Sequence, residues 1–153
     1  MLNKKRIKYF LLVLIIITGN YFANENSLKF ESNIEKAFEN AKAEGKYVLV
    51  YFSGSDWCRP CMQLHLEVFE SEQFLDFAKL NLLIVRLDFP SKDENKLSEE
   101  QFEYNNKMAQ TLNKKGVFPY LILYDSAQNE LLDIAGYNRS GPEEIIKLLK
   151  SKM

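Results

Sequence analysis

The residues best suited to chemistry lie in the segment Trp57-Cys58-Arg59-Pro60-Cys61. Cys58 and Cys61 are the only two cysteines of the 153-residue chain. A disulfide that closes so small a loop restricts the unfolded chain little, so stabilisation is a weak reason for the pair. Thiol–disulfide exchange is a stronger reason, because one thiolate attacks a disulfide and a nearby second thiol resolves the product. The spacing therefore favours a redox pair in which Cys58 attacks and Cys61 resolves.

A metal site is the alternative role for the same cysteines. Structural zinc takes four protein ligands, and the only other soft candidate is His65, the single histidine of the chain. Redox chemistry is therefore favoured, and it requires neither a metal nor a cofactor. His65 follows Cys61 by four residues, which places it on the same helical face if the helix is regular. A copper site made of Cys58, Cys61 and His65, or a binding module without catalysis, is the competing hypothesis.

A strand before the cysteines and a helix after them would position this chemistry. Residues 47–52 are an uninterrupted apolar and aromatic run, typical of a strand buried on both faces. Residues 53–56 break the run, and helix-favouring residues continue from Cys58 to about residue 69. The free N–H groups and the dipole at a helix start stabilise negative charge. We therefore expect Cys58 to be exposed with a lowered pKa, and Cys61 to be buried one turn later.

The neighbours of the two cysteines have supporting roles in this interpretation. Pro60 is tolerated in the first helical turn, where its missing N–H would lack a partner anyway, and it stiffens the loop. The positive charge of Arg59 favours the ionised form of the adjacent thiol. Trp57 is expected to form an apolar rim that receives the substrate.

The rest of the chain alternates strands and helices, which predicts one α/β domain. Further strands are expected at residues 28–30, 82–89, 120–124 and 130–135. Further helices are expected after the capping boxes at 32–35 and 98–101, after Ser71, and after a cap at 140–143, with Gly45 and Gly116 ending the first two. Expected core positions include Phe102, Ala109, Leu112, Ile145, Ile146, Leu148 and Leu149. Residues 91–96 are expected to be a solvated loop.

Two segments resemble the thioredoxin superfamily. Residues 48–61 read Val-Leu-Val-Tyr-Phe-Ser-Gly-Ser-Asp-Trp-Cys-Arg-Pro-Cys, similar to the active-site segment of exported thioredoxin-like proteins and of the terminal domain of transmembrane thiol:disulfide interchange reductases. Val117-Phe118-Pro119-Tyr120 stands where the superfamily keeps a cis-proline. The likeness covers residues 28–152. It implies a thioredoxin fold, with a central mixed sheet of four to five strands flanked by helices.

The resemblance also implies roles for individual residues. Pro119 would lie against the cysteine pair, and the backbone of Phe118 would pair with the substrate. Trp57 and Pro60 match the reducing members of the superfamily, which favours a reductase or isomerase over an oxidase. One position departs from the family: thioredoxins keep a buried Asp on the strand before the motif, and the aligned residue here is Tyr51. Arg86 stands where thioredoxins have a Lys.

Residues 1–23 have the pattern of an export signal. Four basic residues precede the ten-residue apolar run 9–18, which has the length of a signal-peptide core and is shorter than the roughly 20 residues that span a bilayer. We therefore expect a signal peptide or N-terminal membrane anchor at 1–23, a linker at 24–27 and one thioredoxin-like domain at 28–153. The expected location is the bacterial periplasm or the outer face of the cytoplasmic membrane.

Charge and location constrain the partners. Removing the leader takes away four basic residues and no acidic one, which leaves 16 basic residues against 21 acidic residues. A mildly acidic body without a basic stripe disfavours nucleic acid, because phosphate binding needs clustered Lys and Arg. The expected partners are disulfides of exported proteins and an electron donor in the membrane or cytoplasm. The protein itself is expected to be a monomer.

Overall fold

The computed structural model describes residues 27–153; the leader expected at 1–23 and most of the linker lie outside the described residues. A five-stranded mixed sheet forms the centre, in the order β1-β3-β2-β4-β5. Its strands are β1 (Phe30–Glu31), β2 (Tyr47–Ser53), β3 (Leu82–Asp88), β4 (Tyr120–Tyr124) and β5 (Glu130–Ala135). The expected mixed sheet of four to five strands is confirmed.

The strand directions bring distant segments to one edge of the sheet. β1, β3 and β2 are parallel, so the residues that follow β2 and β3 leave the sheet on the same side. β4 runs antiparallel to β2, with Phe52 opposite Tyr120. The residues just before β4 therefore lie at that same edge. The cysteine segment, the segment after Asp88 and Phe118-Pro119 all meet there.

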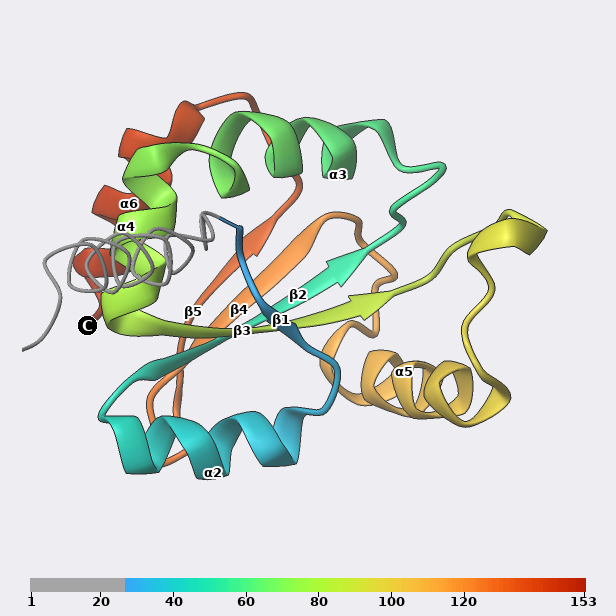
Figure 1. Ribbon diagram of the computed structural model, residues 1–153, viewed down its shortest axis with the longest axis horizontal. Helices are drawn as coiled ribbons and strands as arrows, with labels where there is room; N and C mark the ends of the chain where they lie inside the picture. The colour runs from blue at the N-terminus through green and yellow to red at the C-terminus, as the bar shows by residue number, and fades with distance from the viewer. Residues whose placement is uncertain (1–26) are drawn as a thin grey trace, which may run out of the picture.

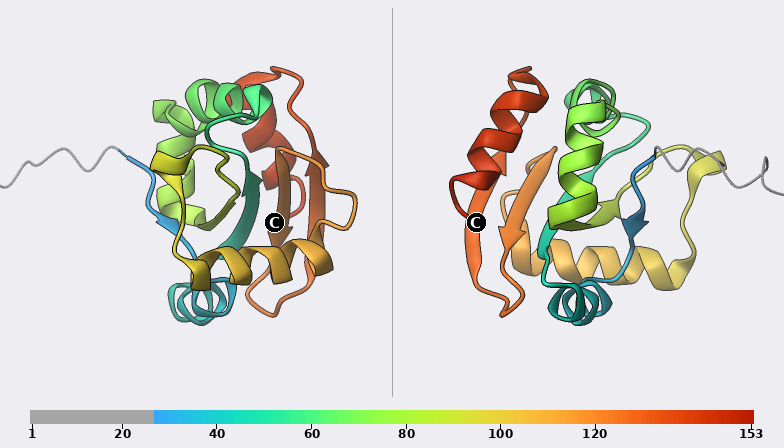
Figure 2. Two further views of the ribbon diagram at one scale, coloured as in Figure 1. Left: turned by 90° about the vertical axis from the view of Figure 1, so that its right-hand side faces the viewer. Right: turned by 60° about the vertical axis from the view of Figure 1, so that its left-hand side comes forward.

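Helices cover both faces of the sheet (Figures 1 and 2). One face carries α2 (Ile34–Glu44) and α5 (Glu99–Leu112). The other carries α3 (Arg59–Leu64), the π-helical turn η1 (His65–Phe69), α4 (Glu72–Asn81) and α6 (Gly141–Lys150). Alternate residues of β2 supply the two cores: Leu49 and Tyr51 pack on the α3 side, and Val48, Val50 and Phe52 on the α2 side. β2 is thus buried on both faces, as expected.

Several expected helix boundaries are wrong. The helix after the cysteines is not one regular α-helix, because α3 ends at Leu64 and η1 continues it in π geometry. Asn33, and not Ser32, caps α2, since its side chain accepts the Lys36 N–H. The helix α5 ends at Leu112, before Gly116. Ser140 precedes α6 but forms no side-chain capping bond.

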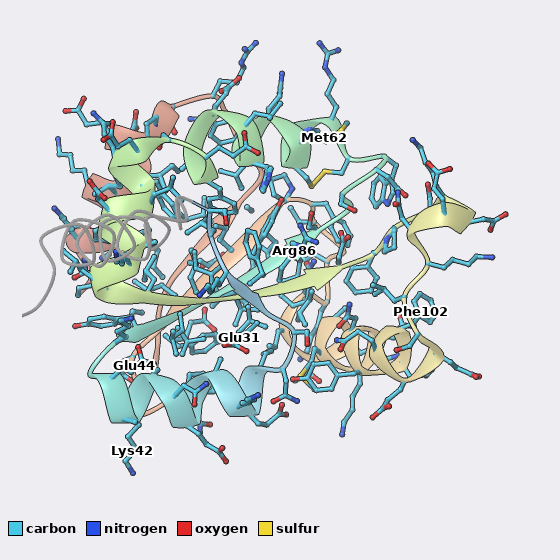
Figure 3. The ribbon with its side chains drawn as sticks, viewed as in Figure 1. Glu31, Lys42, Glu44, Met62, Arg86 and Phe102 are labelled. Carbon is cyan, nitrogen blue, oxygen red and sulfur yellow. A yellow bond between two sulfur atoms is a disulfide. The ribbon has the colours of Figure 1, made fainter. Side chains whose placement is uncertain are left out.

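Two expected core residues are at the surface. Phe102 is 44% exposed, because Asn105 takes the buried position in the first half of α5 and donates a hydrogen bond to the Asp88 carbonyl (Figure 3 labels Phe102). Leu148 is 37% exposed, because Ile145 and Leu149 form the buried stripe of α6. Ala109, Leu112 and Ile146 are partly buried against the two cores, as expected. Within residues 27–153, every helix is too short or too polar to cross a bilayer.

Candidate functional site

Cys58 and Cys61 form a disulfide at the junction between β2 and α3. Figure 3 draws it as a yellow bond beside Met62. Cys58 is the N-cap residue of α3, and its sulfur accepts a hydrogen bond from the Cys61 backbone N–H at 3.2 Å. A backbone donor is therefore aimed at the sulfur that would carry negative charge after reduction. This is the arrangement expected from a Cys-x-x-Cys pair at a helix start.

The expected exposure of Cys58 is wrong for the disulfide form. Cys58 is 4% exposed and Cys61 is 1% exposed, so both are buried. The reason is that the Cys58 sulfur is turned inward, bonded to Cys61 Sγ and facing the Cys61 N–H. Arg59 and Pro60, between the two cysteines, are exposed.

Aromatic side chains form a surface beside the disulfide. Trp57 is 48% exposed, and its ring lies 5.4 Å from the ring of Phe118 in an edge-to-face arrangement. The indole N–H donates a 2.6 Å hydrogen bond to the Phe89 carbonyl, and the Phe89 ring lies 5.6 Å from Phe118. A Cβ at Gly54 would collide with the indole ring, so glycine is needed beneath Trp57. The position of the indole is therefore fixed by the Phe118 ring, by the hydrogen bond to Phe89 and by the close approach of Gly54.

Pro119 stands beside this aromatic surface. The Phe118–Pro119 peptide bond is cis, as the resemblance implies. Pro119 is buried and Phe118 is half-buried, and the Pro119 carbonyl accepts the Gly136 N–H at 2.8 Å. The contact between Phe118 and Trp57 brings this segment to the cysteine loop. Three residues singled out in the sequence, Trp57, Phe118 and Pro119, thus gather at one place.

A surface cavity of about 370 Å³ reaches Cys61. Tyr51, Ser53, Ser55 and Arg86 line it, together with Met62, His65 and Leu66. The Tyr51 hydroxyl donates a 3.4 Å hydrogen bond to the Cys61 carbonyl. Burial raises the pKa of Tyr51, against a hydrogen bond with Ser53 and the nearby Arg86 charge, which lower it. Tyr51 is therefore a protonated hydroxyl beside Cys61, where thioredoxins keep a carboxyl group.

His65 faces groups other than the cysteines. Its Nε2 lies 3.2 Å from a Glu70 carboxylate oxygen, and its ring lies 6.1 Å from Phe30 and 6.3 Å from Phe69. In the part of the chain that the structure describes, no three His, Cys, Asp or Glu side chains are grouped as metal ligands. The copper-site alternative, made of Cys58, Cys61 and His65, is therefore not among the groupings seen in residues 27–153.

Sequence reasoning missed two carboxylates next to the motif. Asp88, at the end of β3, accepts hydrogen bonds from the Ser55 N–H at 2.9 Å and the Ser55 hydroxyl at 2.5 Å. Asp56 accepts four hydrogen bonds from residues 91–95. Their partners are more than 30 residues away in the sequence. The only local signal was the run Ser53-Gly54-Ser55-Asp56, which reads simply as a strand break.

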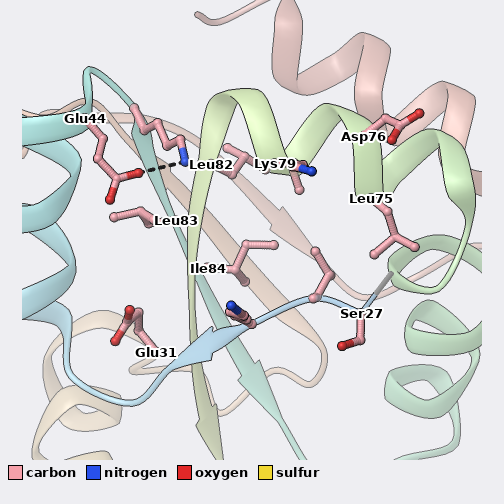
Figure 4. Close-up of a pocket in the computed structure, with 13 residues that line it drawn as sticks. Ser27, Glu31, Glu44, Leu75, Asp76, Lys79, Leu82, Leu83 and Ile84 are labelled. Atoms are coloured by element: carbon pink, nitrogen blue, oxygen red, sulfur yellow. Dashed lines mark ion pairs between the residues drawn. The ribbon is translucent and has the colours of Figure 1, made fainter. Parts of the chain in front are cut away.

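A second surface cavity lies away from the disulfide (Figure 4). It runs along the β1–β3 edge, between the end of α2 and the side of α4. Its lining includes Glu44 and Lys46, which form an ion pair at 2.8 Å, and the apolar residues Leu75, Leu82 and Ile84. None of the residues expected to react or to bind substrate lines it.

Comparison with known proteins identifies the family. The model of the thioredoxin-like domain matches residues 34–152. The chain belongs to the thioredoxin-like family. Within it, the chain is 32% identical over 127 residues to the disulfide bond reductase DsbH of Chlamydia pneumoniae, an alignment that covers 83% of this chain and 74% of that protein.

Two further comparisons agree with this assignment. The solved structure of a DsbH oxidoreductase matches with a TM-score of 0.73 and 30% identity, over 82% of this chain and 84% of that one. The thioredoxin-related protein DsbJ of Chlamydia pneumoniae is 25% identical over 119 residues, 77% of this chain, although the alignment spans only 33% of DsbJ. Together with the Cys58–Cys61 disulfide, the family assignment makes this thioredoxin-like protein a thiol–disulfide oxidoreductase.

Proposed function

We propose that the protein reduces or isomerises disulfides of exported polypeptides, with Cys58 as the attacking thiol and Cys61 as the resolving thiol. The observation that carries the proposal is the position of the pair. Cys58 caps α3, its sulfur receives the Cys61 N–H, and an exposed aromatic surface lies beside it. The name of the relative DsbH, a disulfide bond reductase, supports the reducing direction.

The reaction balances in two exchange steps. The Cys58 thiolate attacks one sulfur of the substrate disulfide, which forms a mixed disulfide and releases the first substrate thiolate. The Cys61 thiolate then attacks the Cys58 sulfur, which releases the second substrate thiolate and leaves the Cys58–Cys61 disulfide. Two electrons have passed to the substrate. A donor in the membrane or cytoplasm must return two electrons and two protons to the cysteine pair.

The neighbouring residues take the roles that the sequence suggested. Trp57 and Phe118 receive the apolar part of the substrate, the Phe118 backbone pairs with the substrate chain, and Pro119 borders the disulfide. The exposed charge of Arg59 favours the Cys58 thiolate. The proton that leaves Cys61 passes into the cavity that Tyr51 lines, in place of a transfer to a buried carboxyl group.

Location and domain organisation complete the proposal. We assign residues 28–153 to the catalytic domain, 24–27 to a linker, and 1–23 to a signal peptide or membrane anchor. Export places the domain in the periplasm or at the outer face of the cytoplasmic membrane, where disulfides of exported proteins form. The protein acts as a monomer.

Reduction of insulin by dithiothreitol tests this function against copper binding. We expect the protein to accelerate precipitation of the reduced insulin chains, and His65→Ala to retain at least about half of the activity, because His65 faces Glu70. If His65→Ala instead abolishes a stoichiometric copper complex and the wild-type protein does not reduce insulin, the copper-binding alternative is correct.

A further inference from the structure

The outer part of the segment that follows β3 is hydrogen-bonded to the cysteine loop through one carboxylate, that of Asp56. One Asp56 oxygen accepts the Ser91 N–H at 2.8 Å and the Ser91 hydroxyl at 3.4 Å. The other accepts the Lys92 N–H at 2.9 Å and the Asn95 side-chain amide at 3.0 Å. These hydrogen bonds lower the pKa of Asp56 to about 2, so the carboxylate is ionised at any working pH. Hydrogen bonds to an ionised acceptor are the stronger kind. We call residues 89–97 the clamped loop.

Little else holds the outer part of this loop. Residues 91–96 are all exposed, and the short 3₁₀ turn at Asp93–Asn95 buries none of its residues. The ion pair between Lys96 and Asp93 is internal to the loop. Figure 1 shows the turn, in yellow, standing beyond the ends of β2 and β3. A segment with so few buried contacts becomes mobile when its hydrogen bonds are removed.

Phe89, the first residue of the clamped loop, is the hydrogen-bond partner of the Trp57 side chain. The Phe89 carbonyl accepts the indole N–H, and the Phe89 backbone N–H donates to the Ser53 carbonyl at 2.8 Å. Asp56 immediately precedes Trp57. The carboxylate therefore ties together the two chain segments that orient the half-exposed indole.

We propose that Asp56 is a positioning residue, which holds the clamped loop beside Trp57 as a preformed contact surface for polypeptide substrates. This inference rests on the proposed function and adds the surface that would bind its polypeptide substrates. A small disulfide reaches only the cysteines, whereas a polypeptide extends over the Trp57 ring and the clamped loop. A surface that is ordered before binding saves the cost of ordering it during binding. Loss of the clamp therefore weakens the binding of polypeptides selectively.

The test compares two disulfides, insulin and oxidised glutathione, in steady-state reduction. Asp56→Asn places an amide against the N–H donors, and we expect the KM for insulin to rise about tenfold, equal to about 1.4 kcal/mol. The kcat for insulin and the kcat/KM for oxidised glutathione should each change by less than about twofold. Asn95→Ala, which removes one bond of the clamp but keeps the charge of Asp56, should raise the KM for insulin in the same direction.

Asp125 provides a matched control. It also accepts two backbone N–H groups and one asparagine amide, from Ala127 and Asn129, in the turn between β4 and β5. Asp125→Asn should leave both KM values unchanged. Equal effects of Asp56→Asn on both substrates, the same effect from Asp125→Asn, or no effect from Asn95→Ala would overturn the positioning role. If the wild-type protein reduces neither substrate, the proposed function fails and this inference fails with it.

Discussion

Cys58→Ser should lower the rate of insulin reduction by at least about a thousandfold, to the uncatalysed level. A serine hydroxyl is not ionised at neutral pH and cannot form the mixed disulfide, so the covalent route is lost completely. Arg59 and the Cys61 N–H then have no thiolate to stabilise. The measurement is insulin reduction at fixed dithiothreitol concentration, with the wild-type protein and Cys58→Ser at equal concentration.

The control for this variant is its stability. Removing a disulfide that closes a four-residue loop costs about 2 kcal/mol by the chain-entropy estimate, which a folded domain of this size withstands. Cys58→Ser should therefore unfold at the same denaturant concentration as the reduced wild-type protein, which also lacks the bond. A variant that is folded and still reduces insulin at the wild-type rate would show that Cys58 is not the attacking thiol.

Cys61→Ala should stop the catalytic cycle at the mixed disulfide between Cys58 and the substrate. With the resolving thiol gone, the mixed disulfide on Cys58 can be released only by an external thiol, so it accumulates. No other thiol of the chain can resolve this mixed disulfide, because Cys58 and Cys61 are the only cysteines. Without added reductant, most of the pre-reduced variant should migrate on a non-reducing gel as an adduct with its substrate polypeptide.

The double variant Cys58→Ala/Cys61→Ala is the matched control for trapping and should form no adduct. Mass spectrometry of the adduct isolated from cells would identify the physiological substrates. An adduct formed by Cys58→Ala, with Cys61 as the only thiol, and not by Cys61→Ala would mean that the two cysteines have the opposite roles.

The fold could be predicted from the sequence because its signals are local. The apolar run at residues 47–52 predicts a strand buried on both faces, and β2 supplies both cores. The capping residues Ser71 and Ser98 begin their helices as expected, since each hydroxyl accepts an N–H within one turn. The Cys58–Cys61 pair could be recognised from its spacing at the end of a predicted strand. The Phe118–Pro119 segment could be recognised from a proline directly before another predicted strand.

The remaining features depend on partners that are distant in the sequence. Asp56 reads as part of a loop, and its role follows only from the N–H groups of residues 91 and 92, which the parallel strands bring to the same edge. Phe102 reads as a core residue, but Asn105 takes the buried position through a bond to the Asp88 carbonyl. The π geometry at His65–Phe69 likewise has no local signal in the sequence.

The reduction potential of the Cys58–Cys61 pair tests the proposed direction most directly. Thioredoxin lies near −270 mV and strong oxidants near −120 mV. The exposed Arg59 stabilises the Cys58 thiolate, hence the reduced form, and a tenfold change in the exchange equilibrium corresponds to about 30 mV. Equilibration with glutathione or dithiothreitol buffers should therefore give a potential between about −270 and −240 mV. A potential above about −160 mV would contradict the account and make the protein an oxidant.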